Sequence, residues 1–338
     1  MPPASPSTPT IRTPETTLPQ AAAPRTGTGA TFLPLPLLVA VFCLLWSSAF
    51  AGAKMALADC PPLILLATRL LLAGTLMLAL APLGDSGTRR LGVPAFRRRD
   101  LAALVGIGIL NNAVYLGLNW TALTFTSSAY TAVLTSCLPL LVALGAGPLL
   151  GEKMSLAKWA GIALGLLGVV IVLRSRLGGA HESLAGTLLI GGGVSALAAG
   201  TLAFKYFAPR GGVWSGNAVQ CLSGGIALVP IALATESTAD IHFTANLFGG
   251  LAFLVIAVSI GGYGLWFYLL TRSSATAASS LHFLMPPLGL LFGWLLLGEA
   301  VPPLDMIGIV PIALGIWLVT RPARRPALTA STPPSAVP

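Results

Sequence analysis

The feature that most constrains this chain is its long runs of apolar residues without charge. From Leu101 to Gly151 there is no Asp, Glu, Lys or Arg. At a helical rise of about 1.5 Å per residue, this run is far longer than one bilayer crossing, which needs about 20 apolar residues. Only 9% of all residues are charged, whereas about a quarter is usual in a soluble domain. The sequence therefore predicts an integral membrane protein.

Charged residues, Pro/Gly clusters and polar turns divide the chain into candidate spans. The polar segment 121–128 splits the long apolar run into two. Because an open segment in lipid must satisfy its own backbone hydrogen bonds, we expect helices. The predicted fold class is all-α integral membrane, with ten transmembrane helices over 33–54, 62–82, 101–121, 127–149, 157–174, 184–207, 213–234, 246–270, 275–297 and 303–320.

The distribution of positive charge orients these spans. If the N-terminus is cytoplasmic, only Lys54, Arg174 and Arg176 of the 19 Lys and Arg residues fall on the outer side, and Arg69 falls inside a span. The remainder lie at the inner side, as the positive-inside rule requires. Both termini are thus predicted to be cytoplasmic. The net charge of +9 belongs to these loops, so we expect no nucleic-acid partner.

The two ends of the chain and its cysteines carry little information on function. Segments 1–30 and 322–338 are rich in Pro, Thr and Ala, and we expect both to be disordered. The four cysteines are widely spaced and form no CxxC pair, which gives no indication of a metal or redox site. No cofactor is expected.

An internal repeat divides the folded body into two halves, 31–176 and 184–321. Residues of the first half recur in the second at one constant interval, without a gap: Pro139/Pro286, Gly151/Gly298, Glu152/Glu299, Gly161/Gly308, Gly168/Gly315 and Arg174/Arg321. Each half then contains five helices, and an odd number gives the second half the opposite orientation. Two inverted five-helix repeats are an architecture of alternating-access transporters.

The repeats resemble two EamA domains of the drug/metabolite transporter superfamily. The likeness rests on the segment Trp46-Ser-Ser-Ala-Phe, on Arg69, and on a Pro followed by Leu-Gly-Glu at the end of the fourth and ninth helices. It covers about 31–321. It implies an exporter or exchanger of small metabolites such as amino acids, often in the bacterial inner membrane.

Polar residues in the third span are candidates for lining a solute cavity. Asn111, Tyr115 and Asn119 recur every four residues, so on an α-helix they share one face. The alternative is that they form inter-helix hydrogen bonds that hold the bundle together.

The eighth span offers a second set of candidates. Ser259, Tyr263 and Trp266 share a helical face, and with Trp46 and Trp214 they could form an aromatic cage for an organic or cationic group. The alternative is that these aromatic residues anchor the helices at the membrane interface.

Two ionisable residues within spans are also candidates. Arg69 lies about eight residues into the second span, too deep for simple snorkelling, and could attract a carboxylate or contact helix carbonyls. His282 is the only histidine in a span, and could relay protons or be a neutral hydrogen-bonding group. Pro139 and Pro286 are the candidate hinges, because proline interrupts the helical hydrogen-bond ladder.

These observations favour a secondary transporter of small organic metabolites that works by alternating access. The expected partners are a small solute and the lipid bilayer, with the protein a monomer or homodimer. The alternatives are a membrane-embedded enzyme and a structural or signalling protein. The chain has no HExxH motif and no carboxylate in the middle of a span, so we expect no enzyme and no proton coupling through a membrane carboxylate.

Overall fold

Helices make up nearly the whole of the chain that can be described. The computed structural model describes residues 34–84, 96–122, 126, 131, 134–174, 183–210, 212–297 and 306–321. No strand occurs in these ranges, which confirms the all-α class. The helices are α1 (Leu35–Leu57), α2 (Pro62–Gly84), α3 (Arg98–Gly108), η1 (Ile109–Leu116), α4 (Gly117–Ala122), α6 (Leu138–Leu150), α7 (Leu156–Leu173), α8 (Leu184–Phe207), α9 (Val213–Thr235), η3 (Thr238–Asp240), α10 (Ala245–Phe253), η4 (Leu254–Gly262), α11 (Tyr263–Arg272), α12 (Ala275–Ser280), η5 (Leu281–Leu284), α13 (Met285–Leu297) and α15 (Ile309–Thr320).

Six of the described helical segments are long and apolar enough to cross a membrane: Pro62–Ala81, Arg98–Ala122, Leu156–Leu173, Leu184–Phe207, Val213–Thr235 and Ala245–Arg272. Shorter apolar helices cover Leu35–Ala49, Leu138–Leu150 and Ile309–Thr320. Large apolar side chains such as Leu156, Leu188 and Ile226 are exposed, as expected where lipid is the solvent. The protein is a multi-pass membrane protein. The count of ten spans stays a prediction, and the expected disordered tails and Glu299 lie outside the described residues.

Serine or threonine residues cap the start of several of these helices. Ser155, Ser183, Thr244 and Ser274 precede α7, α8, α10 and α12, and each side chain accepts a hydrogen bond from a first-turn N–H. Such caps satisfy donors that the helix itself leaves free. The boundaries of these spans are therefore encoded locally in the sequence.

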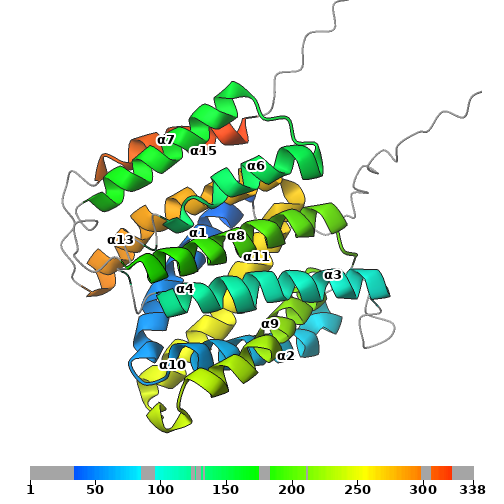
Figure 1. Ribbon diagram of the computed structural model, residues 1–338, viewed down its shortest axis with the longest axis vertical. Coiled ribbons are helices and arrows are strands. Elements are labelled where there is room, and N and C mark those ends of the chain that lie inside the picture. The colour runs from blue at the N-terminus through cyan, green and yellow to red at the C-terminus, as the bar shows by residue number, and fades with distance from the viewer. Residues whose placement is uncertain are drawn as a thin grey trace, which may run out of the picture. The chain divides into compact units, whose positions relative to one another are not determined.

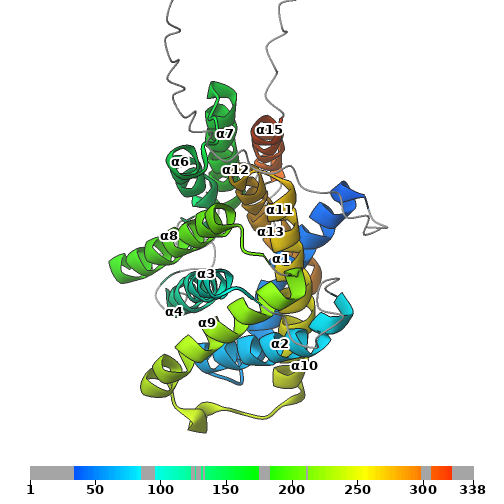
Figure 2. The same ribbon diagram turned by 90° about the vertical axis from the view of Figure 1, so that its right-hand side faces the viewer.

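Helices from the first half of the chain pack mainly against helices from the second half. α2 lies along α9, and α7 lies along α15; both pairs are side by side in Figures 1 and 2. α1 packs against α10, η4 and α13, while α8 packs against α3, η1, α4 and α6. Residues distant in sequence thus form most of the core.

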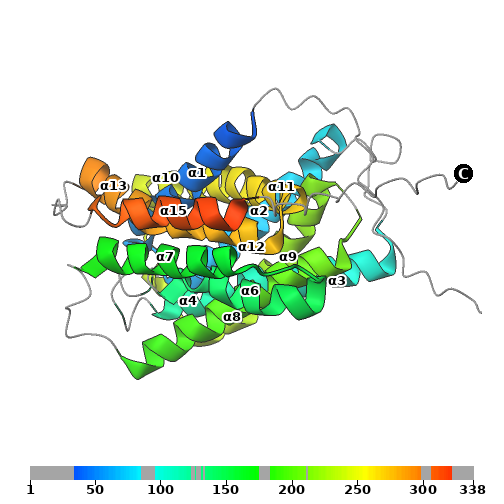
Figure 3. The ribbon, with the colours of Figure 1, turned by 90° about the horizontal axis from the view of Figure 1, so that it is seen from above.

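The repeated glycines are the closest points between α7 and α15, which run together in Figure 3. A Cβ atom on Gly161 would lie 2.7 Å from the carbonyl oxygen of Gly315, and one on Gly168 would lie 2.7 Å from that of Gly308. Contacts this close need residues without a side chain, as is common between membrane helices. Each glycine of one copy faces a glycine of the other.

A carboxylate joins the two halves at the end of α6. Gly151 ends this helix with a φ of 67°, a left-handed conformation that suits glycine. The following Glu152 accepts hydrogen bonds from the Ala275 N–H (2.6 Å) and the Thr276 hydroxyl (2.9 Å), at the start of α12. Lys205 near the end of α8 interacts electrostatically with Glu152. We refer to these interactions as the Glu152 contact.

A second carboxylate joins the halves after the far end of α9. Glu236 accepts hydrogen bonds from the N–H groups of Leu63 and Ile64, both at 2.8 Å, and so caps the start of α2. Next to it, Asp59 accepts a hydrogen bond from the Thr244 hydroxyl at 2.5 Å. We refer to these interactions as the Glu236 contact. At the helical rise, α9 is about 35 Å long, so its two ends lie about that far apart.

Between α1 and α2, Cys60 lies beside the Glu236 contact. Burial raises the pKa of the Cys60 thiol above its ordinary value, and the Glu236 carboxylate raises this pKa further. The thiol therefore stays protonated near neutral pH.

Candidate functional site

Arg69 is the central feature of the candidate site. α2 carries it into the core, where its side chain is 2% exposed. Its Nε donates a hydrogen bond to the Ser259 hydroxyl at 2.8 Å, and Tyr263 and Cys221 lie nearby. Across the described ranges the structure records no ion pair between Arg69 and a carboxylate. A buried cation is costly without a counter-charge, so this site is suited to an anionic group.

Tyr263 connects Arg69 to a cluster of aromatic rings. The Tyr263 hydroxyl is buried and has no hydrogen-bond partner among the described residues. Its ring lies 4.7 Å from that of Trp46, and the Trp46 and Trp266 rings are 6.4 Å apart. The structure thus brings Arg69, Ser259, Tyr263, Trp46 and Trp266 together from α1, α2, η4 and α11.

His282, in the short helix η5, joins the same cluster. Its ring centroid lies 5.0 Å from that of Trp266 and 5.7 Å from that of Trp46. Nδ1 is 3.2 Å from the Ser279 carbonyl oxygen, whereas Nε2 is buried without a partner in the described part of the chain. Sequence reasoning did not single out Phe42, whose ring stacks on Trp266 at 5.7 Å, because a phenylalanine in an apolar span gives no distinguishing signal.

The polar residues of the third span lie against α8. The Asn111 amide packs on Gly200, where a Cβ would lie 1.9 Å from its Oδ1. Asn119 packs on Gly193 and donates a hydrogen bond to the Tyr115 carbonyl oxygen at 3.0 Å. Both atoms of the Asn111 amide lack a described partner. A role of these residues in solute binding stays a prediction.

The two spans that supply most candidates both contain a π-helix. Residues Ile109–Leu116 and Leu254–Gly262 have this wider turn, in which hydrogen bonds link i to i+5 and four residues no longer complete a turn. Tyr115 lies within the first, and Tyr263 follows the second directly. The spacing used to group the third-span residues therefore differs in the structure.

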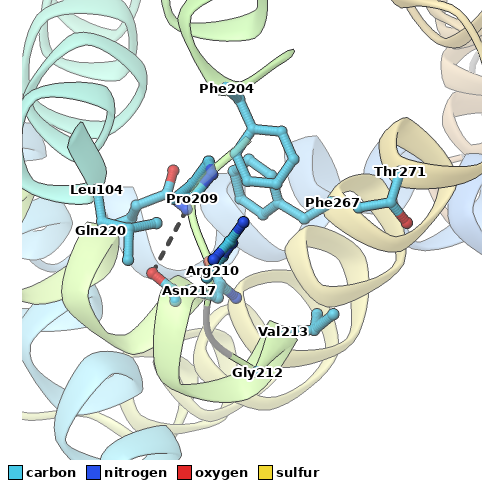
Figure 4. Close-up of a pocket in the computed structure, with 11 residues that line it drawn as sticks. Leu104, Phe204, Pro209, Arg210, Gly212, Val213, Asn217, Gln220, Phe267 and Thr271 are labelled. Atoms are coloured by element: carbon cyan, nitrogen blue, oxygen red, sulfur yellow. Dashed lines mark hydrogen bonds between the residues drawn. The ribbon is translucent and has the colours of Figure 1, made fainter. Parts of the chain in front are cut away.

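Two amides on α9 extend the site beyond the residues selected from the sequence. Asn217 donates a hydrogen bond to the Ser259 carbonyl oxygen at 3.1 Å, and Gln220 is fully buried. Both line a cavity of about 60 Å³ beside the central cluster (Figure 4). Their proximity to Ser259 depends on the packing of α9, which local sequence does not reveal.

The remaining candidates lie at helix starts. Pro139 is in the first turn of α6, and Pro286 is the second residue of α13, directly after the 3₁₀ helix η5. In the first turn of α6 proline removes no internal helical hydrogen bond, whereas Pro286 lies within the unbroken helical run 275–297; a hinge motion at either stays a prediction. Trp214 lies half-buried in the first turn of α9, and its part in an aromatic cage stays a prediction. Within the described ranges, no three His, Cys, Asp or Glu side chains gather as a metal site would require.

Comparison with known proteins decides the family. The model of the EamA-like transporter family matches residues 34–174 and again residues 184–321. This chain belongs to the EamA-like transporter family. The two matches also confirm that the sequence contains two copies of the domain.

Relatives of this EamA-family transporter are similar over most of their length. One is an "Uncharacterized transporter YvbV" of Bacillus subtilis, 27% identical over 84% of this chain and 90% of the relative. Another is a "Probable amino-acid metabolite efflux pump" of Salmonella typhimurium, 29% identical over 84% of this chain and 93% of the relative. A crystal structure with 22% identity has a TM-score of 0.69 and covers 84% of this chain and 95% of its own; this similarity shows the fold alone. The chain is thus a small-molecule transporter.

Proposed function

We propose that this protein is a secondary transporter that carries small organic metabolites with a carboxylate, amino acids or related compounds, by alternating access. It works as an exporter or exchanger. Ten transmembrane helices form two inverted five-helix repeats, with both termini on the cytoplasmic side of the bacterial inner membrane.

The observation that carries this proposal is that the buried Arg69 has no carboxylate partner among the described residues. An arginine guanidinium offers paired N–H groups that match a carboxylate, and only its Nε has a recorded hydrogen bond, to Ser259. A solute carboxylate would supply the missing counter-charge. The nearby unpartnered Tyr263 hydroxyl would donate to the same carboxylate or accept from the solute amine.

The contacts between the halves support alternating access. The Glu152 contact joins the repeats on the side that the charge distribution assigns to the cytoplasm, and the Glu236 contact joins them on the outer side. Opening a central site toward one side requires the repeats to separate there while staying together at the other. Each contact is therefore a gate for one side of the membrane.

The names of the relatives also favour this proposal. The Salmonella relative carries amino-acid metabolite efflux in its name, and the relatives are named as transporters, which favours transport over catalysis. In this proposal Arg69 binds the solute carboxylate without a coupling ion. Exchange of one carboxylate solute for another is then the simplest transport cycle.

Transport by purified protein in liposomes tests the proposal. Vesicles are preloaded with single unlabelled amino acids, and entry of the labelled counterpart is measured by counterflow. We expect counterflow for at least one amino acid. Arg69→Gln should reduce it at least tenfold, since charge-assisted hydrogen bonds of about 1.5–3 kcal/mol are lost.

Arg272→Gln is the matched control, because it removes an arginine that is exposed and stacks on Tyr268. This variant should keep counterflow near the wild-type level. Wild-type vesicles that carry out no counterflow with any amino acid would contradict the proposed substrate class. An Arg69→Gln variant that transports carboxylates normally would contradict the role of Arg69.

A further inference from the structure

The side chain of Asn217 lies between the two helices that carry Arg69 and Ser259. It is 1% exposed and stands on α9, which packs along α2. Its Nδ2 donates to the Ser259 carbonyl oxygen at 3.1 Å and to the Met77 Sδ at 3.3 Å. Met77 follows Arg69 on α2 by about two helical turns. One amide group thus contacts both helices that form the Arg69–Ser259 hydrogen bond.

The carbonyl that Asn217 binds belongs to the π-helix η4. In an α-helix the N–H of Tyr263 would donate to the Ser259 carbonyl, four residues earlier. Here this N–H donates to the carbonyl oxygens of Val258 and Ile260 instead. A side chain from α9 therefore supplies a donor at the point where the backbone departs from the α-helical pattern. Short π-helical turns of this kind are frequent at functional sites.

The direction of the Ser259 hydroxyl depends on this backbone geometry. The hydroxyl accepts the hydrogen bond from the Arg69 Nε at 2.8 Å. A π-helical turn holds more residues than an α-helical one, so a change of η4 to the α form would rotate Ser259 about the helix axis relative to Tyr263. The hydroxyl would then no longer lie opposite the guanidinium. The bond from Asn217 stabilises the form in which it does.

The first half of the chain contains a comparable bond that does not lead to the arginine. Asn112 corresponds to Ser259 at the interval of the repeat and lies in the π-helix η1. It is 1% exposed, and its Nδ2 donates to the Gln220 carbonyl oxygen at 3.0 Å. Gln220 follows Asn217 by three residues on α9, so both lie in one turn. This turn of α9 thus joins each π-helix through one buried amide.

We propose that Asn217 is a positioning residue of the central site. By holding the Ser259 carbonyl it sets the π-helical turn that aims the Ser259 hydroxyl at Arg69, and so it orients the guanidinium for a carboxylate. Asn217 acts through Ser259 rather than by contact with the solute. The consequence for solute binding rests on the proposed transport function, whereas the orientation of Arg69 is a property of the protein alone.

Hydrogen exchange at the Arg69 Nε reports this orientation without any solute. The full-length protein is prepared with nitrogen-15 in its arginines, and exchange of the Nε–H protons with water is measured by NMR. The other arginines of the described ranges are exposed, and Arg69→Gln identifies the Arg69 signal by its loss. We expect Asn217→Leu, which lacks the amide donor, to speed exchange at Arg69 about tenfold. Ser259→Ala, which removes the acceptor hydroxyl itself, should do the same.

Asn112→Leu is the matched control. It removes a buried amide bond of the same kind to the same turn of α9 but leaves the Ser259–Arg69 bond in place, so exchange at Arg69 should match the wild type. In counterflow of labelled L-valine, Asn217→Leu should raise the half-saturation constant about fivefold to tenfold with a maximal rate near that of the wild type. Asn112→Leu should leave the half-saturation constant unchanged. If either leucine variant fails to fold, Asn217→Ala and Asn112→Ala give the same comparison.

The outcomes separate the two proposals. Unchanged exchange at Arg69 in folded Asn217→Leu protein would overturn the positioning role, and a raised half-saturation constant beside it would indicate direct contact with the solute. Equal acceleration of exchange in Asn217→Leu and Asn112→Leu would also overturn the role, since that result indicates general loosening of the bundle. Wild-type vesicles that carry out no counterflow with any amino acid would contradict the proposed function, and the exchange rates would still decide the role of Asn217.

Discussion

Arg69 and Tyr263 are buried polar side chains that the described protein leaves incompletely satisfied. Arg69 has one recorded hydrogen bond, and the Tyr263 hydroxyl has none in the described structure. Such groups are uncommon in protein interiors because each unmade hydrogen bond costs stability. Because the two lie close together, we expect one solute to satisfy both.

The Tyr263→Phe substitution tests whether the Tyr263 hydroxyl serves solute binding or the stability of the fold. Since no described partner is lost, we expect the melting temperature to stay the same or rise, while the half-saturation constant for the transported amino acid increases about fivefold to tenfold, in line with a hydrogen bond of roughly 1 kcal/mol or more. Tyr268→Phe, outside the cluster, is the control. A lower melting temperature with unchanged half-saturation would assign the hydroxyl a structural role.

The Cys60 thiol gives a pH-dependent measurement beside the Glu236 contact. Because burial and Glu236 raise its pKa, its thiolate fraction at pH 8 is smaller than that of a free cysteine. We expect slow maleimide labelling at pH 8, with the rate still rising well above that pH. Glu236→Gln should lower the pKa and speed labelling at pH 8. A labelling profile with its midpoint at the ordinary cysteine pKa in the wild type would contradict this prediction.

At the scale of helices, the sequence predicts where polar side chains lie along a span but not the local helix geometry around them. Runs of apolar residues locate α2, α8 and α9 within a few residues. The π-helices Ile109–Leu116 and Leu254–Gly262 were not predicted, because their wider turns arise from packing and leave no periodic signal. Even so, Asn111 and Asn119 of the third span both pack on glycines of α8.

The Gly151-Glu152 motif has a role that only the fold reveals. From the sequence, Glu152 is recognisable only as part of a repeated Gly-Glu pair that marks the turn at the end of its helix. In the structure Gly151 supplies that turn, and Glu152 caps α12 in the other half. The contact across the repeats depends on tertiary packing, so its partner could not be read from the chain.

Glu152→Gln and Glu236→Gln should shift the transporter in opposite directions. With Cys221 as the sole cysteine, labelling by an impermeant thiol reagent reports access to the core from each side, since this thiol is buried near Arg69. We expect Glu152→Gln to raise cytoplasmic labelling about tenfold, the effect of one lost charge-assisted hydrogen bond. Glu236→Gln should raise outer labelling instead.

Thr320→Val, at an exposed site, controls for general loosening by a substitution near the membrane surface. Equal increases from both sides in either glutamate variant would mean that the contacts merely hold the bundle together. No change in either variant would mean that they do not restrain opening.

At the scale of the whole molecule, the repeat and the family were predictable, but the pairing of the halves was not. Apolar periodicity and the recurring Pro, Gly and Glu residues point to two copies of one domain, which the family match confirms. The pairing of α2 with α9 and of α7 with α15 needs the structure, because apolar helices in lipid carry no strong directional signal for their partners.

Gly168→Ala tests the close approach of α7 and α15. A methyl group there would meet the Gly308 backbone at 2.7 Å, so we expect a loss of about 1–3 kcal/mol through overpacking. Gly191→Ala is the control, since its Cβ would meet no atom within 4 Å, and there alanine should raise stability slightly through its helix propensity. Denaturant titration of both variants measures the change in the free energy of unfolding. Equal stability in the two would contradict the tight contact.

Because the glycine contacts cross between the two repeats, a substitution in one half of the gene affects the packing of the other half. Gly161 meets the glycine that corresponds to Gly168, and Gly168 meets the one that corresponds to Gly161. A duplicated segment normally frees one copy to diverge, but here any larger residue in either copy collides with the backbone of its sister. After duplication, these four positions are therefore held as glycine in both copies.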